Sequence, residues 1–158
     1  MAYKSSDDVA DLQGFFADLV RCETRLYNTL NDGLREAHGI VTSQFEFLRF
    51  LREHPGSRVA DLAAEFAIGA GATSKGVDRL EKRGWIIRQS NPADRRSSLL
   101  ALTDEGAQLL GAAETTFTAR LKELVEGALD PSATADAARA LRRLRATLEH
   151  DQIGTPTG

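Results

Sequence analysis

The segment formed by residues 78–103 restricts the possible fold of this chain more than any other part of the sequence. It begins inside a predicted helix that Gly84 should end, because glycine is the usual residue just past a helix terminus. Residues 85–88 have the apolar character of a strand, residues 91–94 are typical of a turn, and residues 97–102 predict a returning strand. The predicted unit is a helix followed by a two-stranded hairpin.

Basic side chains gather around this unit. Residues 69–103 contain seven basic and three acidic side chains, whereas residues 1–57 and 104–158 each contain six basic and nine acidic ones. The formal net charge of -3 would by itself argue against a nucleic-acid partner, because domains that bind nucleic acids are usually basic. The uneven distribution nevertheless predicts a positive centre that can attract a polyanion.

Helical periodicity precedes the hairpin. Apolar side chains at three- and four-residue steps predict a long helix near residues 7–34, a second helix capped by Thr42, and a short third helix over residues 58–67. A flexible turn at residues 69–71 then leads to the helix that ends at Gly84. At 100° per residue, that helix places three side chains inward (Thr73, Val77 and Leu80) and three cations outward (Lys75, Arg79 and Lys82).

Two short helices joined by a tight turn and followed by a hairpin make a winged helix-turn-helix. Two more helices are predicted after it, one capped by Thr103 and one by Asp130. The expected fold class is therefore mainly α (α+β). The first helix and the last two have long apolar stripes, which are usually buried against another long helix or a second subunit.

Several other classes of protein are not expected. The sequence contains no run of 18 apolar residues and no apolar segment typical of a secretory signal, so we expect neither a membrane protein nor a secreted one. A single cysteine allows no internal disulfide, which suits the cytoplasm. The three histidines lack the spacing of metal ligands, and residues 69–75 lack the spacing of a phosphate-binding loop. We therefore expect no metal, no cofactor and no enzymatic activity.

Four short motifs follow one another along the chain: Val-Asp-Arg-Leu-Glu at residues 77–81, Arg-Gly-Trp at 83–85, Asp-Arg-Arg at 94–96 and Leu-Thr-Asp-Glu-Gly at 102–106. Together they resemble the multiple antibiotic resistance regulator (MarR) family of bacterial transcription factors. Each motif alone is common, but their order and spacing are specific. The resemblance implies a homodimer that presents two winged helices to a pseudo-palindromic operator in double-stranded DNA.

This resemblance also implies a division of the chain. Residues 1–38 and 104–153 are expected to form a helical dimerisation region, and residues 39–103 a winged helix that binds DNA. The last residues, 154–158, are rich in glycine, threonine and proline and are expected to be a disordered tail.

The predicted DNA contacts come from the fourth helix and the hairpin turn. They are Ala72, Ser74, Lys75 and Arg79 in the helix, and Asp94, Arg95 and Arg96 in the turn. The resemblance implies that Arg96 enters the minor groove and is steadied by Asp78, while Asp94 shapes the turn. Lys82 and Arg83 are ambiguous, because basic residues near the C-terminus of a helix also interact favourably with the helix dipole. Arg58, at the start of the neighbouring helix, is a further candidate for a phosphate contact.

In the MarR family, a regulator of this kind is typically a repressor that a small aromatic or lipophilic molecule releases from its operator. The candidate residues for such a pocket are Phe16, Leu19, Phe47, Phe50 and Trp85, and each of them is also consistent with plain core packing. Cys22 invites comparison with family members that sense oxidants, but its place in the apolar stripe favours a small buried side chain. Two other functions stay open: a winged helix that binds an acidic protein, and a helical protein that binds a small molecule without DNA.

The start of the fourth helix makes a first prediction. Where the family often has side chains that donate hydrogen bonds, this sequence has Gly69, Gly71 and Ala72. Base recognition should then depend on the Ala72 methyl group, on Lys75 and on DNA shape. In a selection from random duplexes, we expect weak base preferences under the helix start and clear ones in the tract that faces the wing. The reverse distribution would contradict this prediction.

Overall fold

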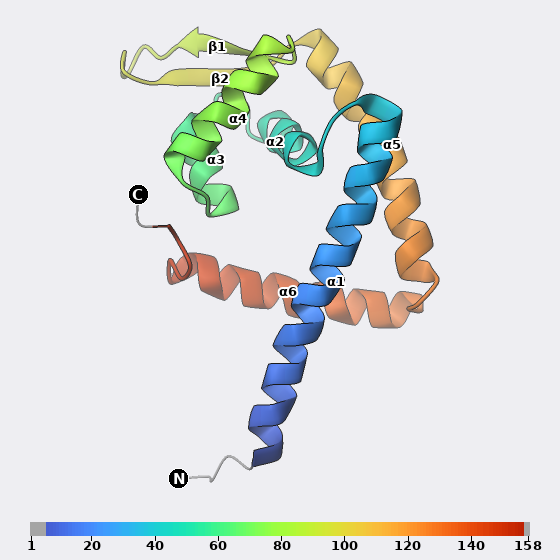
Figure 1. Ribbon diagram of the computed structural model, residues 1–158. Helices are drawn as coiled ribbons and strands as arrows, with labels where there is room; N and C mark the ends of the chain where they lie inside the picture. The colour runs from blue at the N-terminus through green and yellow to red at the C-terminus, as the bar shows by residue number, and fades with distance from the viewer. Residues whose placement is uncertain (1–5, 157–158) are drawn as a thin grey trace.

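The computed structural model describes residues 6–156, and the side chains of residues 11–156 (Figure 1). This part of the chain is mainly helical with one antiparallel two-stranded sheet, which confirms the predicted fold class. The elements are α1 (Ser6–His38), α2 (Thr42–Glu53), α3 (Val59–Phe66), α4 (Ala70–Lys82), β1 (Ile86–Ser90), β2 (Ser98–Leu102), α5 (Asp104–Glu126) and α6 (Pro131–His150).

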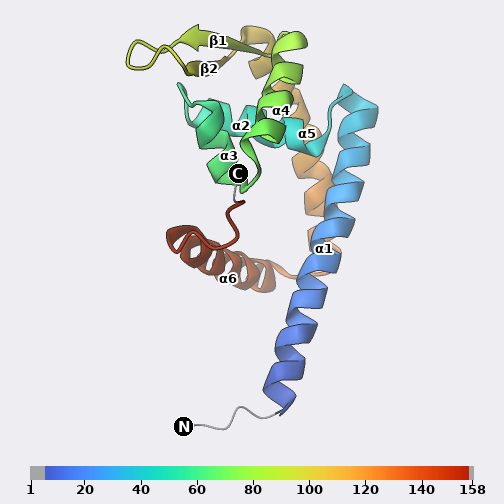
Figure 2. The ribbon, with the colours of Figure 1, turned by 60° about the vertical axis from the view of Figure 1, so that its left-hand side comes forward.

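A winged helix forms one end of the molecule, and long helices extend away from it. In Figures 1 and 2, α2, α3, α4 and the hairpin make a compact unit, α1 and α5 run side by side in opposite directions, and α6 crosses beneath α3. The N-terminal half of α1 projects beyond the other helices in both views.

The core lies between the winged helix and the α1–α5 pair. Its largest fully buried side chains are Leu34, Ile40, Phe45, Leu48, Leu51, Leu62, Leu80, Ile86, Leu100 and Leu110. The predicted inner face of α4 is confirmed, because Thr73, Val77 and Leu80 are all fully buried. Apolar residues at three- and four-residue steps lie on one side of a helix, so this spacing fixes which side of α4 remains for solvent.

Three contacts hold α5 against the first two helices. The Phe45 and Phe117 rings stack with centroids 4.5 Å apart, and the His38 ring lies 2.7 Å from the Thr116 hydroxyl. Arg52 donates two hydrogen bonds, of 2.7 and 2.5 Å, to the Glu114 carboxylate, and this pairing lowers the pKa of Glu114. The orientation of the winged helix relative to α5 is therefore set by both apolar and ionic contacts.

The hairpin joins α4 to α5 at a narrow junction. Ile86 pairs with Leu102 and Arg88 with Leu100 in the strand register. The Thr103 hydroxyl donates to the Gly84 carbonyl over 2.6 Å and accepts from the Gly106 amide over 3.0 Å. Thr103 is thus the N-cap of α5, as predicted, and the same side chain also ties α5 to the end of α4.

Two predicted helix starts are wrong. Thr42 is the first residue of α2 rather than its cap; Val41 occupies the N-cap, and its amide donates to the Gln44 side chain over 3.0 Å. The Thr42 hydroxyl is buried and has no hydrogen-bond partner among the described residues.

The predicted turn at residues 69–71 is also shorter than expected. Gly69 is the N-cap of α4, and Gly71 lies inside the helix. Ala67 makes the turn instead, with a left-handed backbone at φ 49°, and neither Gly69 nor Gly71 has a positive φ.

The first and last helices differ from the core in exposure. Leu12, Phe15 and Phe16 on α1 are more than half exposed, and no residue of α6 is buried. None of the described helices is both long and apolar enough to cross a membrane. Of the predicted disordered tail, residues 157–158 lie outside the described residues.

The close packing at the α4–α5 junction predicts that a methyl group added at Gly106 would destabilise the fold. A Cβ atom on Gly106 would lie 2.0 Å from the Trp85 carbonyl oxygen, whereas a Cβ atom on Gly111 would have no neighbour within 4 Å. We expect Gly106→Ala to lower the free energy of unfolding by about 1–3 kcal/mol, because the backbone must move apart. The control, Gly111→Ala in the same helix, should raise it by up to about 1 kcal/mol. Urea unfolding curves would measure both, and equal effects would contradict the prediction.

Candidate nucleic-acid interface

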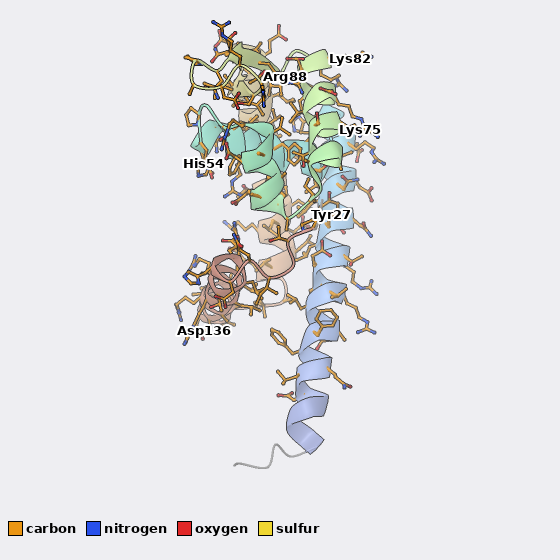
Figure 3. All side chains as sticks on the ribbon, turned by 90° about the vertical axis from the view of Figure 1, so that its left-hand side faces the viewer. Tyr27, His54, Lys75, Lys82, Arg88 and Asp136 are labelled. Atoms are coloured by element: carbon orange, nitrogen blue, oxygen red, sulfur yellow. The ribbon has the colours of Figure 1, made fainter. Side chains whose placement is uncertain are left out.

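The solvent face of α4 carries a row of cations. Lys75, Arg79 and Lys82 are exposed, on the side opposite the buried Thr73, Val77 and Leu80. Figure 3 shows Lys75 and Lys82 along the outside of this helix. Ala72 is exposed near the helix start and Ser74 is half-buried. Every residue predicted to contact DNA from α4 is therefore at least partly accessible.

The wing tip presents two more arginines. Arg95 and Arg96 are exposed and have no salt-bridge partner among residues 11–156. The Asp94 carboxylate accepts a hydrogen bond of 2.9 Å from the Arg96 amide, and the Asn91 side chain accepts one of 3.0 Å from the Ala93 amide. Asp94 has the turn-shaping position that was predicted for it, and the turn holds both guanidinium groups outward.

The partner of Asp78 differs from the prediction. Its carboxylate accepts a hydrogen bond of 2.6 Å from Arg88, not from Arg96. Arg88 also donates to Glu81 over 3.2 Å. The reason is the strand register: Arg88 lies on β1 opposite the buried Leu100, next to α4, whereas Arg96 lies in the distant turn. In Figure 3 Arg88 lies between the hairpin and α4.

The ambiguous cations have different partners. Arg58, the N-cap of α3, forms a salt bridge of 3.1 Å with Asp61, and this pairing raises the pKa of Arg58 and lowers that of Asp61. The Arg83 guanidinium lies 4.3 Å from the centre of the Trp85 ring, which is a cation–π contact at the base of the wing. Arg58, Arg88, Asp94 and Arg96 line a cavity of about 430 Å³. Of the three arginines, Arg96 alone has no salt-bridge partner among the described residues.

The predicted effector residues are not brought together within one chain. Phe16 is 65% exposed on the projecting half of α1, where Leu19 also lies, while Phe47 and Trp85 are buried in the core. Phe50 lines a cavity of about 370 Å³.

That cavity lies between the winged helix and α6. Its other lining residues include Glu46, Phe66 and Arg145, and burial raises the pKa of Glu46. An apolar groove of about 650 Å³ adjoins it along α6 and contains Leu141, Leu144 and Leu148. The stripe of α6 was visible in the sequence, but no local pattern indicates that α6 lies under α3.

Cys22 is exposed, so the predicted buried side chain is wrong for the single chain. Within the described residues, no group of three or more potential ligands could hold a metal ion.

A helix pair with a cationic second helix, followed by a hairpin with arginines at its tip, defines a winged helix-turn-helix protein. The model of the MarR family matches residues 38–97. The HTH-type transcriptional regulator MhqR of Bacillus subtilis is 25% identical over 105 residues, which are 65% of this chain and 72% of that protein. The transcriptional repressor MdtR of the same organism is 35% identical over 71 residues, covering 45% of this chain and 46% of MdtR.

The fold similarity extends further along the chain. Sco3205, a MarR family transcriptional regulator from Streptomyces coelicolor solved in complex with DNA, is 25% identical. It superposes with a TM-score of 0.79 over 94% of this chain and 91% of its own. The chain belongs to the MarR family of transcriptional regulators.

Proposed function

We propose that this chain binds double-stranded DNA through α4 and the wing. The observation that carries the proposal is the accessibility of Lys75, Arg79 and Arg96, none of which has a salt-bridge partner among the described residues. Cations held on a rigid scaffold without internal partners are available to phosphates. The DNA complex of Sco3205 supports this use of the fold.

Each predicted contact has a distinct role in this proposal. The α4 helix enters the major groove, where Lys75 and Arg79 reach phosphates or guanine edges and Ser74 donates a hydrogen bond. The Ala72 methyl group contacts bases at the helix start. Arg96, and Arg95 beside it, enter the minor groove, where a guanidinium suits the negative potential of a narrow groove.

We further propose that the chain functions as a homodimer joined through residues 1–38 and 104–153, with residues 39–103 as the winged helix that binds DNA. Exposed Leu12, Phe15 and Phe16 on α1, and exposed Leu141 and Leu144 on α6, form apolar surfaces that a single chain leaves in water. Burying them against a second copy removes that cost. Two-fold symmetry would then place the recognition helices one DNA turn apart, roughly 34 Å.

Repression and release by a small lipophilic or aromatic molecule complete the proposal. The relative MdtR is named as a repressor, which supports the first part. For the second part, the cavity beside Phe50 and the groove along α6 separate the winged helix from the helical region. A molecule bound there changes DNA affinity only if it favours a spacing of the two wings that differs from the DNA-bound one.

The DNA-binding proposal predicts a specific salt dependence. The unmodified chain should lose affinity for its operator by orders of magnitude between about 50 and 200 mM salt. The variant Lys75→Ala/Arg79→Ala/Arg96→Ala should bind far more weakly, and its log–log salt slope should be flatter by up to about three, about one for each of these cations that neutralises a phosphate. Fluorescence anisotropy with a labelled duplex would measure both quantities.

A matched variant controls for the loss of three charges. Arg21→Ala/Lys122→Ala/Arg143→Ala removes three exposed cations that lie on α1, α5 and α6. Its salt slope should equal that of the unmodified chain. If the first variant bound as tightly as the unmodified chain, DNA binding through this face would be wrong, and the acidic-partner or small-molecule alternatives would take its place.

The dimer proposal predicts the effect of charge on α1. Light scattering should give the unmodified chain twice the mass of one chain, whereas Phe15→Glu/Phe16→Glu should shift it towards the single-chain mass, because each carboxylate would have to be buried. Ile87→Glu is the control, since Ile87 is 44% exposed on the wing and outside both proposed dimerisation segments. A single-chain mass for the unmodified protein would contradict the proposal.

A further inference from the structure

Arg88 forms a bridge between the wing and the recognition helix. Its two terminal nitrogens donate to different carboxylates of α4, Nη2 to Asp78 over 2.6 Å and Nη1 to Glu81 over 3.2 Å. We propose that Arg88 is a positioning residue for DNA binding. In this role it sets the wing against α4 and keeps two acids of α4 away from the DNA phosphates. This inference rests on the DNA-binding function proposed above.

The strand register makes Arg88 suited to this task. Because it pairs with the buried Leu100, its side chain starts on the inner face of the hairpin rather than on the outer face that carries Ile87. Only 28% of the Arg88 side chain is exposed. A planar guanidinium with several donors can bind two carboxylates at once, which a lysine cannot do in the same rigid geometry.

The position of Asp78 on α4 explains why its carboxylate needs a partner. Asp78 is 58% exposed and lies three residues after Lys75 and four before Lys82, so it shares a helix face with both lysines. An unpaired Asp78 would compete with DNA phosphates for these lysines and would repel the phosphates directly. The Arg88 guanidinium instead engages Asp78 from the wing side, and the lysines have no salt-bridge partner among the described residues.

The same bridge constrains geometry. Arg88 is ten residues from Asp78 and seven from Glu81, and the chain between them passes through the turn at Gly84. The two hydrogen bonds therefore close a loop at the base of the wing. With the hairpin base held, Arg95 and Arg96 at its tip keep a fixed direction relative to Lys75 and Arg79.

A double-mutant cycle tests whether Arg88 acts through the two acids. Arg88→Met keeps the apolar stem and removes the charge, and Asp78→Asn/Glu81→Gln removes both acids without changing their size. On the operator duplex, Arg88→Met should weaken binding by about tenfold in the unmodified chain and by less than about twofold in the Asn/Gln background, which corresponds to a coupling within the range seen for contacting residues. Arg88→Lys should give an intermediate loss, because it retains the charge but not the fork.

Two results would overturn the proposal. An equal loss in both backgrounds, with a salt slope lowered by about one, would make Arg88 an ordinary phosphate contact. No loss in either background would make the bridge irrelevant to DNA. Both results presuppose that the unmodified chain binds the duplex. If the unmodified chain fails to bind any duplex, it is the proposed function itself that fails. Circular dichroism of each variant ensures that folded proteins are compared.

Discussion

The arrangement of the proposed DNA-binding surface depends on the close contact between Trp85 and the start of α5. The Thr103 amide donates to the Trp85 carbonyl over 3.0 Å, and its hydroxyl joins the Gly84 carbonyl to the Gly106 amide. Only a glycine at position 106 lets the two backbones approach so closely. One junction therefore holds the end of the recognition helix, both hairpin strands and the long α5 helix in a single geometry.

Electrostatic pairing divides the cations of the winged helix into two groups. Arg58, Arg83 and Arg88 each have an internal partner, which is a carboxylate or an aromatic ring. The other cations of α4 and the hairpin, which have no such partner among the described residues, lie along the solvent face of α4 and at the wing tip. An acidic protein can thus present a basic surface, because the sign of the local field depends on which charges are neutralised nearby rather than on the net charge of the chain.

The helices outside the winged helix differ from it, because they expose apolar side chains to water. On the part of α1 that α5 does not cover, large apolar side chains are exposed. Helix α6 contacts the winged helix through the Arg145–Glu65 salt bridge of 2.6 Å, beside the open groove that runs along α6. Such helices do not support themselves in isolation. The proposed second copy would cover these apolar surfaces, and it would also supply a second basic face for a two-fold symmetric operator.

The sequence by itself determined the local features: the helical stripes, the caps at Thr103 and Asp130, the hairpin with its turn, and the basic centre. These depend on residues only a few positions apart, so periodicity and capping chemistry predict them. Only the tertiary structure decided that Arg88 pairs with Asp78 and that α6 lies under α3. Such contacts depend on the angles at which elements cross, and those angles come from packing between residues far apart in the chain, which no local pattern records.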